Sequence, residues 1–476
     1  MSTTVSGQFT GPPEPKTLIT NLTPLDLLMP RTYVIGVTIS WPISRRVNIE
    51  DVYNHLKSGL KQTIAEIPFV GGSVVPTTSP GKFQIETLPE DFEGEQLIFN
   101  DLRSGSGKNW PHSYKNLRKA GFPSYVFAEE CLTPAKRYLG KEKMPVMAVQ
   151  ANFIDGGLIL HLSVLHTACD AFAWSIVLRV LSANVNASWS AEEGVDVSPN
   201  RILVSDSLDR SPLMRGNSVV SKMDLREYKM QHANSELEDP RAYLIEPPKS
   251  ISEMENVLFS ISTAKLAQLR DYISVSSSSG SWLTVNDALS GFLWYCINHA
   301  RFRKPDENPI RGNLALASDG RAVLNPALPT TYVGNASTGF PITLDIHPTS
   351  IYEAALAISE ARSGFDDKYL RDLTGFLGGL EDITSERVLY AKTLDPILVI
   401  SNVKDMEYYE KDWGGPLGFP DCLRLGSHIT DFIPRVFPMP TQRDGTIDLV
   451  IWIEHSVVQR LMEDDLWSQW IMPPRR

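Results

Sequence analysis

A strand that runs directly into a short histidine-bearing turn constrains this chain more than any other feature. Residues 156–165 read Gly-Gly-Leu-Ile-Leu-His-Leu-Ser-Val-Leu, an apolar run after a turn, which predicts a buried strand. Residues 166–170 read His-Thr-Ala-Cys-Asp, and an apolar helical pattern begins at Asp170. A histidine held at a strand end is well placed to take a proton from an alcohol or an amine. An aspartate four residues later can hold the turn in shape.

The length and charge of the chain exclude several classes of protein. A chain of 476 residues exceeds the usual size of one hydrophobic core, so two domains are expected. Apolar residues make up 42% and charged residues 21%, which is typical of a packed globular enzyme. The formal net charge of −11 argues against a nucleic-acid surface and against an anionic membrane surface. No apolar run approaches the roughly 18–20 residues of a membrane-spanning helix.

The cysteines and the N-terminus predict a cytoplasmic protein without metal. None of the four cysteines lies in a Cys-x-x-Cys pair, so a zinc site or a disulfide framework is not expected: Cys131, Cys169, Cys296 and Cys422. Residues 1–15 are polar and rich in proline, unlike a signal or transit peptide.

The order of helical and strand patterns predicts two α/β domains. An amphipathic helix is expected over Ile49–Ile67, and Thr284 with Asp287 predicts the capped start of another helix. The apolar periodicity fades over residues 184–250. We therefore expect an N-terminal domain at 1–190, a crossover linker at 191–250 and a C-terminal domain at 251–476. Helices and strands of mixed order predict mixed sheets in both domains.

Five blocks of sequence, in one order, resemble a known family. They are Leu-Thr-Pro-Leu-Asp at 22–26, the helix and Pro-x-x-Gly turn at 56–71, His-Thr-Ala-Cys-Asp at 166–170 (the HTACD turn), a mid-chain block with Asp-Gly-Arg at 319–321, Leu-Pro at 328–329 and Tyr-Val-Gly-Asn at 332–335, and Asp-Trp-Gly-Gly-Pro at 412–416 (the DWGGP loop). Together they resemble the BAHD acyltransferases and, more loosely, fungal members such as the trichothecene 3-O-acetyltransferases. The HTACD turn looks like the HxxxD motif of that family. The resemblance implies two similar chloramphenicol-acetyltransferase-like domains, each a mixed sheet flanked by helices, with an active-site channel between them.

The resemblance also implies roles for single residues. His166 would be the general base, and Asp170 would support the turn through an ion pair with Arg321. Asp412 would have an architectural role in its loop.

Four further residues are candidates for places near the reacting groups. Trp413 and Gly414 would line the channel. Thr338 or Ser337, which follow the Tyr-Val-Gly-Asn block, would be candidates to stabilise the oxyanion.

The implied activity is transfer of an acyl group from acyl-CoA to a hydroxyl, or an amine, of a specialised small molecule. Acyl-CoA, with acetyl-CoA as the expected form, would be a co-substrate, with no permanently bound cofactor and no metal. We expect a monomer. The DWGGP loop departs from the family's Asp-Phe-Gly-Trp-Gly, which leaves open an alternative in secondary metabolism: Dieckmann-type intramolecular cyclisation, or chain release from a carrier protein. A non-catalytic binding protein is the other rival, and the intact His166 and Asp170 argue against it.

Several other residues have ordinary structural interpretations. His161 alternates with apolar residues along the strand, and Cys169 is expected to pack rather than to react. Residues 105–108 read Gly-Ser-Gly-Lys, but Asn109 follows where a phosphate-binding loop needs Ser or Thr.

Overall fold

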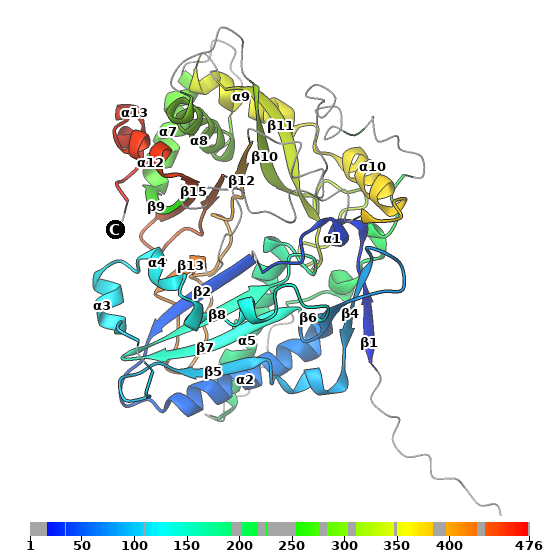
Figure 1. The fold of residues 1–476 in the computed structure, drawn as a ribbon, viewed down its shortest axis with the longest axis vertical. Coiled ribbons are helices and arrows are strands. Elements are labelled where there is room, and N and C mark those ends of the chain that lie inside the picture. The colour runs from blue at the N-terminus through cyan, green and yellow to red at the C-terminus, as the bar shows by residue number, and fades with distance from the viewer. Residues whose placement is uncertain are drawn as a thin grey trace, which may run out of the picture.

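The structure, a computed structural model, describes residues 17–33, 35–108, 110–192, 194, 202–217, 225, 254–275, 283–302, 311–346, 350–383, 397–425 and 434–474. In Figure 1 the N-terminal half, in blue to teal, lies below the C-terminal half, in green to red. Each half is built on a mixed β-sheet with helices against it. This is the predicted α/β architecture of two halves.

The N-terminal half contains two sheets. Its strands are β1 (Leu18–Asn21), β2 (Ile35–Pro42), β3 (Ser73–Pro76), β4 (Phe83–Thr87), β5 (Leu97–Asp101), β6 (Met144–Pro145), β7 (Met147–Ile154) and β8 (Gly157–Val164). Its α-helices are α1 (Pro24–Leu28), α2 (Ile49–Glu66), α3 (Tyr114–Lys119), α4 (Ser124–Phe127) and α5 (Ala171–Glu192). Short 3-10 helices cover Pro68–Val70, Pro89–Glu93, Glu130–Leu132, Ala135–Arg137, Ser205–Leu208 and Ser211–Leu213.

The C-terminal half is built around a six-stranded sheet. Its strands are β9 (Met254–Ser262), β10 (Arg311–Asp319), β11 (Ser337–Asp345), β12 (Ile397–Ile400), β14 (Arg435–Pro438) and β15 (Thr446–Glu454), in the order β11-β10-β12-β14-β15-β9. The contacts of β12 with β10 and β14 are parallel, and the other pairs are antiparallel. The helices are α7 (Thr263–Val275), α8 (Val285–Arg301), α9 (Ile351–Arg362), α10 (Asp367–Gly378), α12 (His455–Met462) and α13 (Asp465–Trp470).

The sheet that carries the HTACD turn has the order β13-β2-β8-β7-β5. Because side chains alternate along β8, Leu160 and Leu162 face the same apolar core as α2 and α5, whereas His161 faces the opposite side. Segment 102–143, with α3 and α4, covers that opposite side, where Ile159 joins a separate apolar cluster. Both faces of β8 are therefore covered, and all eight of its residues are buried.

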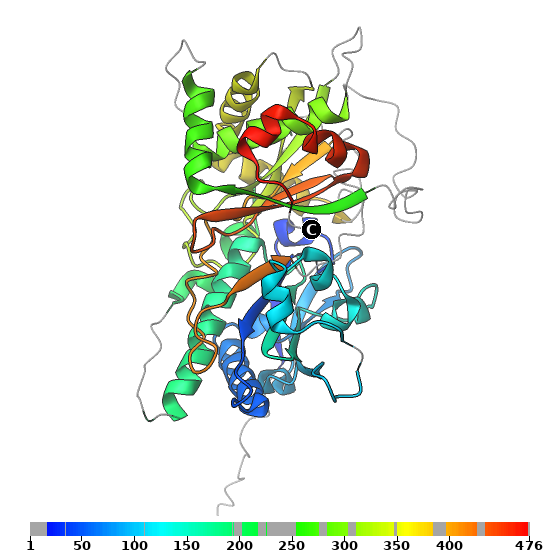
Figure 2. The same cartoon turned by 90° about the vertical axis from the view of Figure 1, so that its left-hand side faces the viewer.

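One strand of this sheet comes from the other half of the chain. Strand β13 (Cys422–Leu425) pairs antiparallel with β2, from Cys422 opposite Ser40 to Leu425 opposite Val37. The orange segment in Figure 2 descends from the upper half into the lower half to make this contact. Inside it, the buried Arg424 pairs with Asp448 at 3.0 Å. The domain boundaries at 190 and 250 stay a prediction. Strand β13 lies within the predicted C-terminal domain by sequence, but it belongs to a sheet of the N-terminal half.

The sequence located strongly patterned elements well and missed others. Helix α2 lies where its pattern places it, and Thr284 and Asp287 form the expected capping box of α8. Helix α5 begins at Ala171, directly after the Asp170 at which the helical pattern starts, and it extends to Glu192. Asp464 separates α12 from α13, because it caps α13 by accepting a hydrogen bond from Trp467 N–H at 2.7 Å.

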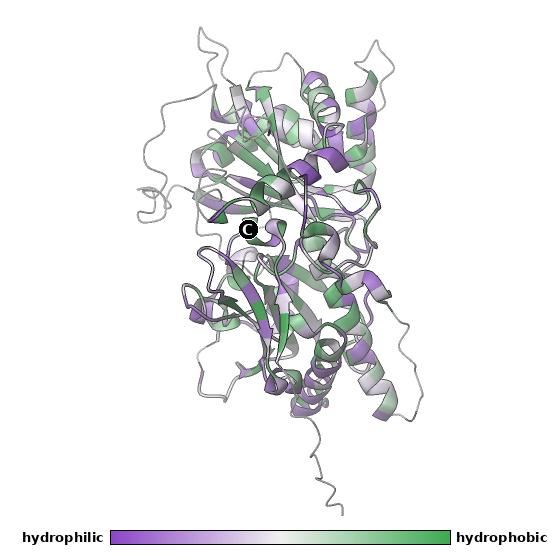
Figure 3. Cartoon of the chain, turned by 90° about the vertical axis from the view of Figure 1, so that its right-hand side faces the viewer, coloured by the Kyte–Doolittle hydropathy of each residue, from purple (hydrophilic) through white to green (hydrophobic). Residues whose placement is uncertain are grey.

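The distribution of hydropathy fits helices that cover sheets. In Figure 3 polar and apolar colours alternate along the helices at the bottom of the molecule. Among the described residues, no helix combines the length and the apolar character needed to cross a membrane.

Candidate active site

The HTACD turn connects the end of β8 to the start of α5 and presents the imidazole of His166. The backbone N–H of His166 donates to the carbonyl of Thr32 at 3.0 Å, and Leu165 N–H donates to Val146 at 2.9 Å. Leu165 and Thr167 have no accessible surface, whereas His166 keeps a partly exposed side chain. The turn therefore anchors its backbone and its neighbours while it leaves the ring accessible.

Asp170 lies in a buried web of donors and does not face the imidazole edge of the turn. Its two carboxylate oxygens accept hydrogen bonds from Arg321 at 3.0 and 3.1 Å, and the N–H of Ala173 donates to it at 2.8 Å, as at a helix N-cap. Ser337 donates through both its N–H, at 3.1 Å, and its hydroxyl, at 3.0 Å. Burial alone raises the pKa of Asp170, but the Arg321 charge and these donors bring that pKa below its ordinary value.

Arg321 connects this carboxylate to the Tyr-Val-Gly-Asn block. Its guanidinium donates to Asp319 at 2.6 Å and to the carbonyls of Tyr332 and Gly334, each at 3.0 Å. Although burial opposes its charge, Asp170 and Asp319 raise the pKa of Arg321. The predicted partners Asp170 and Arg321 are thus in direct contact, inside a network that joins α5 to β10 and β11.

A second buried carboxylate, Asp26, holds the turn from the N-terminal side. It accepts hydrogen bonds from Thr23 N–H at 2.8 Å and from Asn335 N–H at 3.0 Å, and it pairs with Arg210. Arg210 also donates to the carbonyl of Ala168 at 2.8 Å, and the hydroxyl of Thr167 donates to the carbonyl of Asp26 at 2.9 Å. The first matched block, at 22–26, therefore contacts the turn directly.

Asn335 completes this support with its side-chain amide. Its Nδ2 donates to Asp26 at 2.8 Å and to the backbone carbonyl of His166 at 2.9 Å. The sequence predicted neither Asp26, Arg210 nor Asn335 as a site residue. Asp26 and Asn335 lie inside matched blocks, which was a usable signal, whereas Arg210 lies in a polar segment without one.

The environment of His166 favours the neutral imidazole. Burial lowers its pKa from the ordinary value of 6.5, and the positive charge of Arg435 acts in the same direction. The backbone of His166 itself, the charge of Asp170 and the side chain of Asn335 oppose this change. The net result is a lowered pKa, so the ring is unprotonated at neutral pH and can accept a proton.

Cys169 and His161 both have the structural surroundings that the sequence indicated. Cys169 is fully buried, and burial raises the pKa of its thiol, which makes it a poor nucleophile. His161 Nε2 lies 2.8 Å from the hydroxyl of Thr133 and 2.6 Å from that of Ser163, in the interior of the sheet.

The DWGGP loop packs along the far part of α5. Trp413 has no accessible surface, and its ring lies edge-on to Trp41 with centroids 5.1 Å apart. Asn186 donates to the carbonyl of Asp412 at 3.4 Å, and a Cβ on Gly414 would lie 2.8 Å from the Cα of Asn186. At 1.5 Å rise per residue, Asn186 is about 24 Å along the helix from Asp170. Trp413 thus packs in the core, whereas Gly414 is partly exposed. That the two residues line a channel stays a prediction.

The two residues predicted to stabilise the oxyanion differ in whether they have a free hydrogen-bond donor. Ser337 donates both its N–H and its hydroxyl to Asp170. Thr338 is buried, and its hydroxyl makes no hydrogen bond with the described residues. Thr338 thus has a donor to offer, and Ser337 does not.

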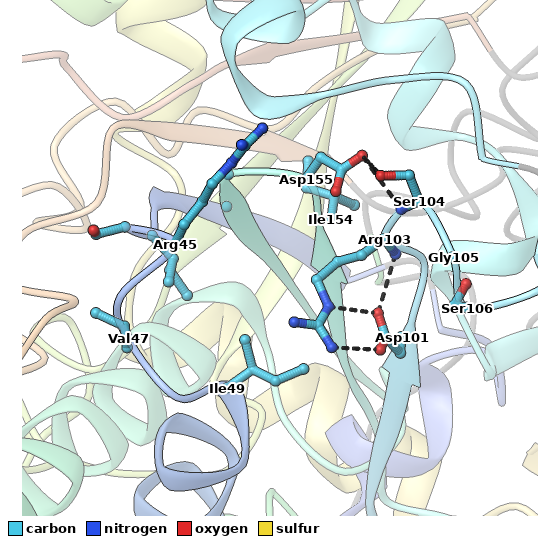
Figure 4. A pocket seen from close by; sticks show the side chains of 14 residues that line it. Arg45, Val47, Ile49, Asp101, Arg103, Ser104, Gly105, Ser106, Ile154 and Asp155 are labelled. Atoms are coloured by element: carbon cyan, nitrogen blue, oxygen red, sulfur yellow. Dashed lines mark hydrogen bonds and ion pairs between the residues drawn. The ribbon is translucent and has the colours of Figure 1, made fainter.

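A surface recess of about 430 Å³ lies at the opposite end of β8 from His166. Gly156 and Gly157 line it, so it is roughly 25 Å along the strand from the HTACD turn. Figure 4 shows that Arg103 points at Asp101 and that Asp155 accepts from Ser104, so these charged groups are already engaged. This recess is separate from the candidate active site.

The fold and the buried web around the HTACD turn define a two-domain α/β protein with a histidine presented between its halves. The sequence profile of the Transferase family matches residues 119–464, and that of the trichothecene 3-O-acetyltransferase-like N-terminal domain matches residues 34–184. The chain therefore belongs to the Transferase (BAHD) family.

Individual relatives agree with this assignment. The chain is 64% identical over 463 residues to the acyltransferase BOA11 of Botryotinia fuckeliana, covering 96% of this chain and 98% of that protein. It is 25% identical to trichothecene 3-O-acetyltransferase TRI101 of Fusarium sporotrichioides, covering 91% of this chain and 92% of that protein. The crystal structure of F. sporotrichioides TRI101, in complex with coenzyme A and T-2, superposes with a TM-score of 0.76 at 21% identity, covering 96% of this chain and 100% of that one. This superposition shows the shared fold.

Proposed function

We propose that this protein transfers an acyl group from acyl-CoA to a hydroxyl of a specialised small molecule, with His166 as the general base. The observation that carries the proposal is the HTACD turn itself. Two buried carboxylates, two buried arginines and a buried amide fix its backbone, while His166 keeps part of its surface exposed and has a lowered pKa. Such a rigid support is what a base needs in order to meet a bound hydroxyl at hydrogen-bond distance.

The reaction needs no covalent enzyme intermediate. Nε2 of His166 accepts the proton as the acceptor oxygen attacks the thioester carbonyl and forms the C–O bond. The C–S bond then breaks, and the imidazolium returns the proton to the thiolate of coenzyme A. The hydroxyl of Thr338 is the proposed donor to the oxyanion, because it is buried and makes no hydrogen bond with the described residues.

The choice of acyl-CoA and of an alcohol follows from relatives. BOA11, at 64% identity, is named an acyltransferase, and TRI101, at 25%, is named a 3-O-acetyltransferase and has been crystallised with coenzyme A. Acetyl-CoA is accordingly the first donor to test. A monomeric state and a cytoplasmic location remain predictions.

Cyclisation or release from a carrier protein is the weaker candidate. The departures in the DWGGP loop were the reason to consider it, and that loop packs on Asn186 and Trp189, far along α5 from His166. Substitutions in the DWGGP loop therefore do not contact His166 or the groups around it.

The test is acceptor-dependent release of coenzyme A thiol. The purified protein is incubated with acetyl-CoA and a panel of polycyclic secondary-metabolite alcohols, and esters are identified by mass spectrometry. We expect thiol release only with an acceptor, and a loss of about 10²- to 10⁴-fold in His166→Ala.

His455→Ala is the control, since His455 is exposed and pairs with Glu255 at the surface. It should keep the wild-type rate. Full turnover in His166→Ala would refute the proposed base, and ester formation without acyl-CoA would refute the proposed donor.

A further inference from the structure

The amide of Asn335 has a fixed orientation beside His166. Asn335 is fully buried, and its Nδ2 lies 2.8 Å from a carboxylate oxygen of Asp26 and 2.9 Å from the carbonyl oxygen of His166. Both of these neighbours can only accept hydrogen bonds, so the amide must turn its NH2 group toward them. Its Oδ1 consequently points away from Asp26.

Two polar atoms in this region lack hydrogen-bond partners in the described part of the chain, and their chemistry would allow them to bond to each other. Oδ1 of Asn335 and Nδ1 of His166 are both buried, and neither makes a hydrogen bond with the described residues. A buried polar atom without a partner destabilises the fold, and such atoms call for an explanation. One of the two is an acceptor, and the other is a donor whenever Nδ1 carries the proton. The amide already touches the residue that carries the second atom.

We propose that Asn335 is the positioning residue of the base. Its Oδ1 accepts a hydrogen bond from Nδ1–H of His166, which selects the tautomer with an unprotonated Nε2 and stabilises the imidazolium formed during transfer. Asp26 acts behind it, since this carboxylate holds the amide through both the N–H and the Nδ2 of Asn335. The inference deepens the proposed function, because it concerns the same base.

The charged groups around the ring act on the pKa of His166 in opposite directions. Asp170, on the same turn, raises the pKa of His166, whereas Arg435 of β14 lowers it. Asp26 and Arg210 form an ion pair behind Asn335. The side chain of Asn335 favours the charged ring, so its removal should lower the pKa of His166.

The first test reads the tautomer directly and needs no turnover. The full chain is labelled with ¹⁵N-histidine, and long-range ¹H–¹⁵N correlations are recorded at a pH where His166 is neutral, with His166→Gln used to assign its signals. We expect the proton on Nδ1 in the wild type, and a shift toward the Nε2–H form in Asn335→Ala. A wild-type proton on Nε2 overturns the inference, whatever any variant does.

The second test is kinetic. In Asn335→Ala we expect the acid limb of kcat/KM to move down by about 1 pH unit, because a hydrogen bond to the charged ring is lost. The kcat should fall about 10-fold or more, and KM for acetyl-CoA should stay within about twofold. If Asn335 had only a structural role, the folded fraction of Asn335→Ala would keep the wild-type acid limb and the wild-type kcat.

Asn298→Ala is the matched control. Asn298 is a buried asparagine of α8 whose Nδ2 donates to the carbonyl of Trp294 at 3.0 Å, away from the turn. It should leave the tautomer and the pH profile unchanged. If Asn335→Ala is folded and behaves like this control, the inference is overturned. If the tautomer depends on Asn335 but no acyl transfer is found, the proposed function fails and the inference stands.

Discussion

The HTACD turn and the DWGGP loop lie at opposite ends of α5, and the chain holds them in different ways. Polar and charged groups fix the turn: Asp170, Arg321, Asp26, Arg210 and Asn335. Apolar contact and close backbone approach fix the loop, with Trp413 against Trp41 and two glycines against α5. Buried hydrogen-bonded charges tolerate few geometries, so they hold one residue in one position. The difference fits the proposal that the turn carries the chemistry, whereas the loop packs on α5 and on Trp41.

The largest difference between the two regions is expected when the buried ion pair between Asp170 and Arg321 is broken. Asp170→Ala leaves Arg321 buried without its main partner, so we expect the free energy of unfolding to fall by about 3–5 kcal/mol and activity to be lost. Asp412→Ala, at the exposed aspartate of the loop, should lower it by less than about 1 kcal/mol. Denaturant unfolding of both variants measures the contrast. Equal losses would mean that the two regions are held alike.

The loop glycines should affect stability rather than turnover. Gly415 has a φ of +48°, and a Cβ there would lie 2.4 Å from the ring of Trp189. We expect Gly415→Ala to lower the free energy of unfolding by about 1–3 kcal/mol, while kcat per folded molecule is unchanged.

Gly105→Ala separates the two causes of this loss. Gly105 has a φ of +95°, but no atom lies within 4 Å of the position that its Cβ would take. It should therefore report backbone strain without the clash, and lose less stability than Gly415→Ala. A lowered kcat in folded Gly415→Ala would give the loop a part in the reaction.

Trp413→Phe tests whether the loop lines a channel. The smaller ring keeps most of the contact with Trp41, so we expect a loss of less than about 1.5 kcal/mol in unfolding free energy. Because Trp413 has no accessible surface, KM for donor and acceptor should not change. Steady-state kinetics with both substrates checks this, and a raised KM would restore the channel role.

The pH dependence sharpens the account of the turn. Burial lowers the pKa of His166 from 6.5, so the neutral base persists to a lower pH than for an exposed histidine. The acid limb of kcat/KM should therefore lie below pH 6.5, measured over a range in which the protein stays folded. An acid limb above that value would contradict a lowered pKa of His166.

The sequence could predict the elements that strong local patterns specify. The capping box of α8 and the amphipathic face of α2 depend on neighbouring residues, and both lie where the patterns indicated. Strand β13 could not be predicted in the N-terminal sheet, because its pairing with β2 joins residues far apart in the chain. The same holds for Arg210 and Asn335, whose partners lie in distant segments and whose importance depends on burial. For Trp413 a matched block suggested a place near the substrate, and the burial of its ring in the core depends on contacts that no local pattern shows.

The most direct test compares His166→Ala with Trp413→Phe in one acyl-transfer assay, with each rate divided by the folded fraction. The account predicts that kcat/KM falls about 10²- to 10⁴-fold in the first variant and less than about twofold in the second. Losses of similar size in both variants, or full activity without the imidazole, would contradict it.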